Sequence, residues 1–293
     1  MNKNNTKYNP LCEEFQKISK RTWNIMHNNL TLPIAVREDG ITALNLQDLI
    51  KIKSNKIRIF DFTPQIESSQ TGADWEWWFI QPGYCFGTAV QAKRLSKKSV
   101  YDVGYKKGSQ IKLLLNYCKS NNITPMYCFY SWWNRPPYKH WPCGSYLEHN
   151  YLWGCSLADG YAIWKLHLQK KHKLSDIHKY TMPWHCIACC PKHIDGGPIG
   201  TATRAAGISV ALRDNILYEL DSKEFPKDDE FPDYDLPQVR QSLPDRISAL
   251  LELSEEDLNY DFIRHYFGEY PPAHIVLQGN FNEVQDDISA NIM

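Results

Sequence analysis

The chain has 293 residues, and its 33 Lys and Arg balance 33 Asp and Glu, so the formal net charge is zero. Hydrophobic residues make up 43% and aromatic residues 13% of the sequence, enough for one large folded domain or two small ones. The sequence has no run of about 18 apolar residues and no apolar N-terminal leader, so we expect a cytoplasmic protein without a membrane span.

The expected secondary structure begins with helices and continues with a β-hairpin. The patterns of apolar residues predict, in chain order, a helix over 11–28, a helix capped by Thr42 and ending near Ile52, strands over 56–62, 73–80 and 84–95, a helix over 109–120 and a central strand over 126–130. Gln81-Pro82-Gly83 marks the turn of an antiparallel hairpin. This order indicates an α/β fold with a mixed central sheet flanked by helices.

The second half of the chain is expected to be mostly helical. Helices are predicted over 156–171, 201–220 and 243–253, with a short strand or tight loop in 182–200. We divide the chain into an N-terminal helix (1–35), a core (36–180), an extension packed on the core (181–278) and a disordered tail (279–293).

Charge is unevenly distributed along the chain. Residues 51–120 hold twelve Lys or Arg and five Asp or Glu, whereas residues 214–262 hold four basic and fifteen acidic residues. A basic segment suits an anionic partner such as nucleic acid, although a solvated surface would show the same composition. The acidic segment is a candidate for an autoinhibitory element over the basic face.

The hairpin carries polar residues that are unusual among aromatic neighbours. Asp74 and Glu76 are two residues apart, and so are Gln91 and Lys93, so each pair shares one face of its strand. Carboxylate and amide oxygens are ligands for Mg²⁺ or Mn²⁺, and a nearby Lys stabilises charge that develops during phosphodiester hydrolysis. A structural salt bridge from a carboxylate to Lys93 is the alternative interpretation.

Asp74 followed after sixteen residues by Gln91-Ala92-Lys93 resembles the PD-(D/E)XK, or restriction-endonuclease-like, nuclease superfamily, over roughly residues 35–130. The phrase TGADWEWW also resembles an uncharacterised set of bacterial proteins. The superfamily core is a helix, a three-stranded meander, a helix and a strand. The resemblance implies that Asp74 binds the metal and that Gln91 and Lys93 stand for the (D/E)XK motif, Gln91 where Asp or Glu is usual.

The resemblance also implies further site residues. An acidic residue on or after the first helix of the core corresponds to Glu38 or Glu67, and the two stay open. Glu76 is a candidate to supply the charge that Gln91 lacks, and Gln110 is the polar residue at the start of the helix after the third strand.

The implied function is Mg²⁺- or Mn²⁺-dependent hydrolysis of nucleic acid, DNA rather than RNA, with a role in bacterial defence against phage or plasmid DNA as the analogy. The alternative is a non-catalytic module that binds nucleic acid or protein and keeps the nuclease-like fold. A homodimer and a regulatory partner protein stay open.

Two other segments carry candidate functions. The Cys/His segment 185–193 contains a CxxC and two histidines, but zinc needs four ligands, so buried reduced thiols are the preferred interpretation. The loop 131–141 interleaves tryptophans with basic residues, which favours either base stacking or packing on the core. Nine cysteines at irregular spacings argue against a disulfide scaffold, and Cys118, Cys128 and Cys155 are expected to be reduced.

Overall fold

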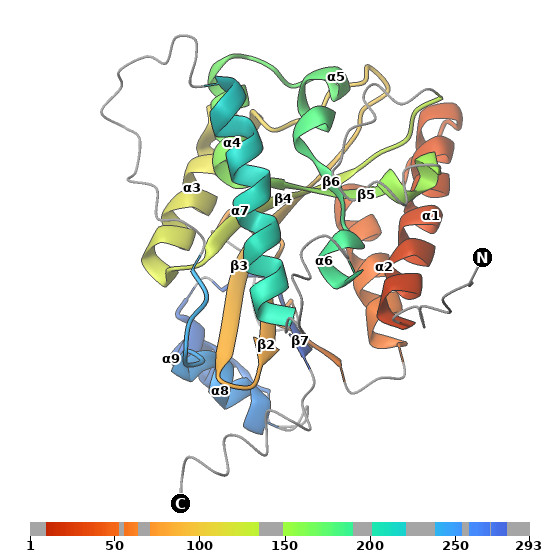
Figure 1. The fold of residues 1–293 in the computed structure, drawn as a ribbon. Coiled ribbons are helices and arrows are strands. Elements are labelled where there is room, and N and C mark those ends of the chain that lie inside the picture. Colours follow the sequence, from red (N-terminus) through yellow and green to blue (C-terminus); the bar gives the residue numbers. More distant parts are fainter. Residues whose placement is uncertain are drawn as a thin grey trace, which may run out of the picture.

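The fold is taken from a computed structural model, which describes residues 10–52, 56–63, 71–134, 149–189, 201–220, 238–253, 258–269 and 271–279. Its centre is a mixed seven-stranded sheet in the order β1-β7-β2-β3-β4-β5-β6 (Figure 1). The strands are β1 (Ile57–Asp61), β2 (Trp75–Gln81), β3 (Tyr84–Arg94), β4 (Thr124–Tyr130), β5 (Cys155–Asp159), β6 (Met182–Pro183) and β7 (His274–Gly279).

Helices surround this sheet. They are α1 (Pro10–Thr31), α2 (Glu38–Ile50), α3 (Tyr105–Asn121), α4 (Gly160–Leu168), α5 (Leu174–Ile177), α6 (Cys186–Cys189), α7 (Thr201–Leu220), α8 (Asp245–Glu252) and α9 (Tyr260–Phe267), with short 3-10 turns at Asn150–Trp153 and His178–Tyr180. In Figure 1, α7 runs in front of β2 and β3, α1 and α2 lie on one side, and α3 and α4 lie on the other. The expected α/β class with a mixed sheet between helices is confirmed.

The predicted hairpin is confirmed in detail. Strands β2 and β3 are antiparallel with Trp75 opposite Val90, and the Asp74 N–H donates to the Val90 carbonyl at 2.8 Å. Strand β4 then runs parallel to β3, with Gln91 beside Tyr127. Two parallel strands need a crossover connection between them, and α3 forms this connection from β3 to β4.

The expected three-stranded meander is wrong, because β7 lies between β1 and β2. Strand β7 is antiparallel to β1 and parallel to β2. The segment HIVLQG comes from the far end of the chain, so the C-terminal region contributes a strand to the sheet itself as well as covering helices. The pattern of apolar residues within one segment indicates whether it forms a helix or a strand, but not which strand it pairs with. It therefore could not predict that β7, from the far end of the chain, pairs with β1 and β2.

Two local predictions also need correction. Thr42 does not cap α2: the helix begins at Glu38, and the buried Thr42 hydroxyl lies 2.9 Å from the Tyr130 hydroxyl. Residues 155–159 form strand β5 rather than the start of a helix, because α4 begins at Gly160, with the Asp159 side chain accepting from the Ala162 N–H. The proposed disordered tail, 279–293, is wrong at its first residue, because Gly279 ends strand β7, and residues 280–293 lie outside the described residues.

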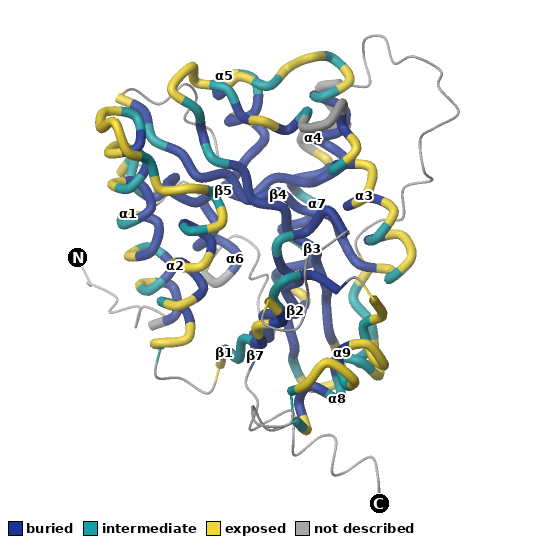
Figure 2. Tube along the Cα trace, turned by 180° about the vertical axis from the view of Figure 1, so that it is seen from behind, coloured by how far each residue is buried: buried dark blue, intermediate teal, exposed yellow. Residues whose placement is uncertain are grey.

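Aromatic side chains connect the N-terminal helix to the sheet. Phe15 of α1 stacks on Trp77 of β2 with ring centroids 5.6 Å apart, and it meets the Trp184 ring edge-on. The Trp184 indole N–H donates to the Phe15 carbonyl at 2.9 Å. Burying such large rings stabilises the fold strongly, so α1 is part of the core. Figure 2 shows buried residues along the strands and exposed residues on the outer sides of α1, α8 and α9.

Cys118, Cys128 and Cys155 are free and buried, as expected, whereas Cys12 is disulfide-bonded. Among the helices of the described ranges, none combines the length and the apolar character that crossing a membrane requires.

Candidate active site

A cavity of about 740 Å³ opens beside the end of β3 that carries Lys93. Its wall contains four residues with cationic side chains and four with carboxylates. The lining residues are Arg37, Glu38, Asp39, Asp74, Lys93, Arg94, Ser96, Lys98, Val100, Tyr101, Asp102, Gln110 and His172. Four of the residues expected from the sequence, Glu38, Asp74, Lys93 and Gln110, therefore share one cavity.

The turn before β2 sets the position of Asp74. Gly72 has a left-handed φ of +73°, and a Cβ there would lie 2.5 Å from the Gln110 carbonyl and 2.7 Å from the Leu114 nitrogen. Only a residue without a side chain can pass this close to α3 in that conformation. The Ala73 N–H donates to the Thr71 hydroxyl at 3.1 Å and closes the turn, so the chain enters the sheet at Asp74.

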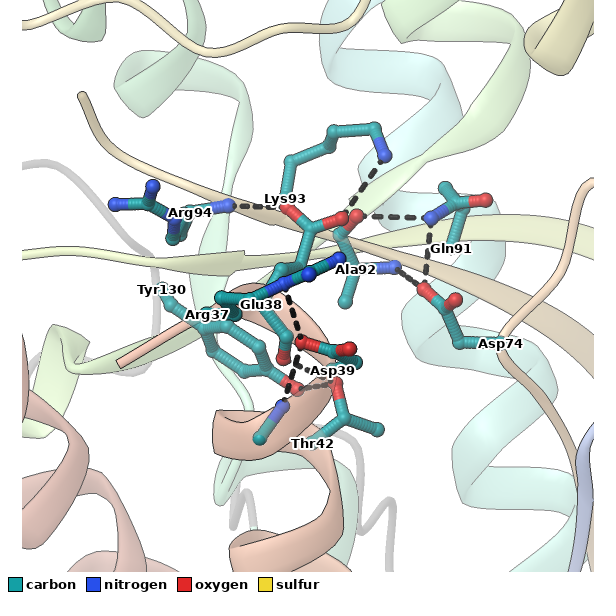
Figure 3. Close-up of polar contacts among 11 residues, drawn as sticks. Arg37, Glu38, Asp39, Thr42, Asp74, Gln91, Ala92, Lys93, Arg94 and Tyr130 are labelled. Atoms are coloured by element: carbon teal, nitrogen blue, oxygen red, sulfur yellow. Dashed lines mark hydrogen bonds and ion pairs between the residues drawn. The ribbon is translucent and has the colours of Figure 1, made fainter. Parts of the chain in front are cut away.

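Asp74 is half-buried and accepts two hydrogen bonds on the same oxygen. The Gln91 Nε2 and the Ala92 N–H donate to Oδ2 at 2.7 Å and 2.6 Å (Figure 3). Among the described residues, none donates to Oδ1. Burial raises the pKa of Asp74 to about 7, aided by Glu38 and Asp39, while the Ala92 N–H and Lys93 oppose the shift. Because burial disfavours the charged form of this carboxyl near neutral pH, a bound cation would stabilise the carboxylate.

Lys93 faces Glu38, the first residue of α2. The Lys93 Nζ lies 3.1 Å from Glu38 Oε1, and the Arg94 N–H donates to Oε2 at 2.8 Å (Figure 3). The Lys93 side chain is 7% exposed and that of Glu38 is 30% exposed. The start of a helix favours a carboxylate electrostatically, so α2 places Glu38 where the helix itself stabilises its charge.

Two buried polar atoms next to Asp74 have no partner among the described residues. They are Gln91 Oε1 and the Tyr127 hydroxyl, which belong to neighbouring positions on β3 and β4. The Asp74 and Glu38 carboxylates raise the pKa of Tyr127 further beyond the effect of its burial, so the hydroxyl keeps its proton. Unpaired buried polar atoms are rare and point to a missing water, ion or ligand.

These donors fit a hard divalent cation. No group of three or more His, Cys, Asp or Glu side chains is arranged to hold a metal within the described ranges. Mg²⁺ does not require such a group, because it commonly takes one or two carboxylates and completes its shell with water and phosphate. Asp74, with a free Oδ1, and Glu38 are the two carboxylates, and Gln91 Oε1 is an oxygen without a partner.

The remaining expected site residues differ in where they lie. Gln110 lies on α3 and lines the cavity. Glu76 does not line it: this carboxylate is fully buried and accepts from Trp78 Nε1 at 2.6 Å, from Arg246 Nη1 at 2.8 Å and from the Tyr117 hydroxyl. Glu76 therefore belongs to a structural ion pair. Glu67 lies outside the described residues, so only Glu38 of the two alternatives is placed beside Lys93.

Sequence reasoning missed several cavity residues. Arg37 and Asp39 flank Glu38 and Arg94 follows Lys93, so adjacency to the predicted residues was a usable signal. Lys98 belongs to the basic segment 51–120. Nothing in the sequence placed His172 beside the hairpin, because it follows a different helix, α4.

The other candidate segments are described in part. Trp132 and Trp133 pack around Trp23 of α1, with centroids 6.3 Å and 4.9 Å from it, so the start of the Trp-rich loop is part of the core. Residues 135–148 lie outside the described residues. In the Cys/His segment, His185 and Cys186 are buried, and residues 190–193 are not described.

Comparison with known proteins identifies one family. Neither the curated proteins nor the solved structures include a match to this chain. The model of a family of unknown function, DUF6615, matches residues 11–278, which spans the whole sheet except its last residue, Gly279. The chain belongs to the DUF6615 family.

Proposed function

We propose that this protein is a metal-dependent nuclease with a restriction-endonuclease-like core. The observation that carries the proposal is the convergence of Asp74, Lys93 and Glu38 at one cavity, where the buried Gln91 amide donates to Asp74. A carboxylate directly before β2, an amide and a lysine on β3, and a second carboxylate from α2 form the set that phosphodiester hydrolysis requires.

Each residue has a role that follows from its contacts. Asp74 and Glu38 would hold Mg²⁺ or Mn²⁺, and Gln91 would add a neutral oxygen once its amide turns from the orientation in which Nε2 donates to Asp74. When bound, the metal would polarise the phosphodiester as a Lewis acid. Lys93, shielded from solvent, would orient the attacking water and stabilise charge on the phosphoryl oxygens, and Gln110 would support the site from α3.

The surroundings of the site favour a polyanionic substrate. Arg37, Arg94 and Lys98 line the same cavity, and Lys97 is exposed in the same loop. Positive side chains at the rim contact phosphates without reading sequence. We infer DNA as the substrate and a role in bacterial defence against invading DNA, by analogy with the resembled superfamily.

Cleavage of nucleic acid by the purified full chain tests the proposal. Supercoiled plasmid, single-stranded DNA and RNA are incubated with Mg²⁺, with Mn²⁺ and with EDTA, beside an Asp74→Ala variant. We expect cutting of DNA in either metal, none in EDTA, and none by the variant. Cutting that persists in EDTA or in Asp74→Ala would exclude this site as the source.

A non-catalytic binding module is the second candidate, and one observation favours it. Both Glu38 oxygens are engaged, by Lys93 and by the Arg94 N–H, so the residue that would complete a metal site already has partners. This candidate predicts nucleic-acid binding of equal affinity in Mg²⁺ and EDTA. Fluorescence anisotropy with a labelled duplex separates the two, because a metal-dependent nuclease binds more tightly with a divalent ion.

A further inference from the structure

His172 belongs to the wall of the same cavity but comes from a different part of the fold. Helix α4 ends at Leu168, and Lys170 adopts a left-handed φ of 57°, which turns the chain back toward the sheet. The Tyr101 N–H donates to the His172 carbonyl at 3.0 Å, and Lys173 forms a β-bridge with Val100. The backbone on both sides of His172 is therefore fixed to the segment that also lines the cavity.

The imidazole of His172 is paired with that of His167. His167 Nδ1 lies 3.0 Å from His172 Nε2. The ring planes differ by 7° and the centroids are 5.1 Å apart, so the rings lie almost in one plane, which is the arrangement of an N–H···N hydrogen bond. One nitrogen of that bond must lack a proton, and the pair therefore carries at most one positive charge.

The surroundings of His167 determine which ring takes the charge. His167 lies beside the Trp164 ring, with centroids 5.5 Å apart. The ring also lies against Gly108, where a Cβ would lie 2.5 Å from His167 Nε2 and where φ is +80°. Burial lowers the pKa of His167, and the neighbouring His172 lowers it further. Its surroundings therefore disfavour a positive charge on His167 and leave it as a neutral hydrogen-bond acceptor.

We propose that His172 binds a phosphate group in the cavity as an imidazolium, with neutral His167 as the positioning residue that accepts its Nε2–H. The inference rests on the proposed function only for the carrier of that phosphate, the nucleic-acid strand. A phosphate dianion or diester favours protonated His172 through charge and a hydrogen bond to Nδ1. This contact would hold the strand on the side of the cavity formed by the 96–104 segment.

Other charged groups surround this pair. The Lys112 Nζ of α3 lies 5.6 Å from the centroid of the Trp164 ring, which also contacts His167. The remaining charged residues of the cavity wall are Lys98 and Asp102 beside Tyr101, Asp74, Lys93 and Arg94 from the hairpin, and Arg37, Glu38 and Asp39 from the start of α2. Lys98 would add a second cation for the phosphate, whereas Asp102 competes with the phosphate for the His172 proton.

NMR of the full chain labelled with ¹⁵N-histidine tests this proposal directly, using inorganic phosphate as the probe. Phosphate should raise the apparent pKa of His172 by about one unit, while His167 keeps its lowered pKa. His265, exposed on α9, is the control for ionic strength. A His172 pKa that does not respond to phosphate, or that moves no more than that of His265, would overturn the proposal.

Two variants separate binding from positioning. His172→Gln should weaken phosphate binding about tenfold or more, because it removes a charge-assisted hydrogen bond. His167→Phe keeps a ring and removes the acceptor, so the response of His172 to phosphate should shrink while His172 remains present. In plasmid cleavage, His172→Gln should raise KM more than it lowers kcat. If the native chain cuts nothing, the nuclease proposal fails, but the NMR titration still decides the role of His172.

Discussion

Asp74, directly before β2, and Glu76, its second residue, are two carboxylates only two residues apart, yet they occupy opposite environments. Glu76 is fully buried and accepts from an indole, a phenol and a guanidinium, which come from β2, α3 and α8. Asp74 is half-buried at a cavity, and two donors share one of its oxygens while the other accepts from no described residue. A buried carboxylate whose oxygens are fully hydrogen-bonded stabilises the structure. A carboxylate with an oxygen that accepts no hydrogen bond can still bind a ligand.

The difference lies in what covers each residue. Helix α8 brings Arg246 over Glu76, and the Tyr117 hydroxyl keeps its proton for donation because burial and the Glu76 carboxylate raise the pKa of Tyr117. Asp74 instead lines the cavity, and none of the described residues donates to its Oδ1. The two carboxylates should therefore respond in opposite directions when their charge is removed.

The largest expected effect is on stability, at Glu76. Glu76→Gln keeps the shape of the side chain but leaves Arg246, whose side chain is only 12% exposed, without its counter-ion. Removing one partner of a buried ion pair costs about 3–5 kcal/mol. Urea denaturation measures this loss.

The exposed pair Arg264–Glu269 provides the matched control. Glu269→Gln should cost below about 1 kcal/mol, since both of its side chains are more than half exposed. A Glu76→Gln variant with native stability but no nuclease activity would place Glu76 in the active site instead.

The next effect is on activity, at Lys93. Lys93→Met preserves most of the apolar stem and removes the ammonium beside Glu38. We expect cleavage to slow by about 100-fold or more, the size seen when one stabilising donor is lost from an active site. Single-turnover plasmid nicking gives the rate. Lys119→Met, exposed on α3 and not part of the cavity wall, should retain native cleavage, and an equal loss in both variants would mean that Lys93 acts only through general charge.

A smaller effect of opposite sign is expected for the stability of an Asp74→Asn variant. The pKa of Asp74 is about 7 in the folded chain and 3.8 in its ordinary state, so the native state binds the proton more tightly than the unfolded state does. Stability contributed by the protonated carboxyl is present below about pH 4 and is lost as the pH rises toward 7.

The uncharged Asn avoids this loss. In EDTA at pH 8 the Asp74→Asn variant should be more stable than the native chain by about 1–3 kcal/mol, and the two should converge near pH 4. Urea denaturation at both pH values checks this. An Asp74→Asn variant that is less stable at pH 8 would show that the carboxylate has a structural role like that of Glu76.

The smallest effect is expected at Gln91. Gln91→Glu introduces a third carboxylate next to Asp74 and should tighten Mn²⁺ binding about tenfold, since the charge of the ligands tunes affinity for divalent cations. Isothermal titration calorimetry at pH 8 measures the affinity, and Gln91→Met should weaken it. Equal Mn²⁺ affinity in all three chains would mean that residue 91 does not contact the ion.

The sequence predicted the hairpin and the cluster that follows from it. Alternating residues and the Gln81-Pro82-Gly83 turn define the register, and the register brings Asp74 against Gln91. Glu76 was assigned to the site by the same alternation. Its pairing with Arg246, 170 residues away, could not be read from local sequence, because only tertiary packing brings α8 over β2.

The insertion of β7 between β1 and β2 escaped prediction for the same reason. The resemblance placed an acidic residue near the first helix of the core, and packing brings Glu38 to Lys93. His172 had no signal at all, since its place depends on the turn at Lys170 and on pairing with Tyr101. Local patterns therefore identified the strands of the site, and contacts across the chain completed its wall.

Plasmid nicking by the Asp74→Asn variant and by the native chain, in Mg²⁺ and in Mn²⁺, is the most direct test of whether Asp74 belongs to a metal-dependent nuclease site. The variant should be folded and more stable at pH 8 in EDTA, so a loss of cleavage cannot come from unfolding. We expect metal-dependent nicking by the native chain and none by the variant. Nicking by both chains at equal rates, or by neither, would contradict the assignment of Asp74 to a metal-dependent nuclease site.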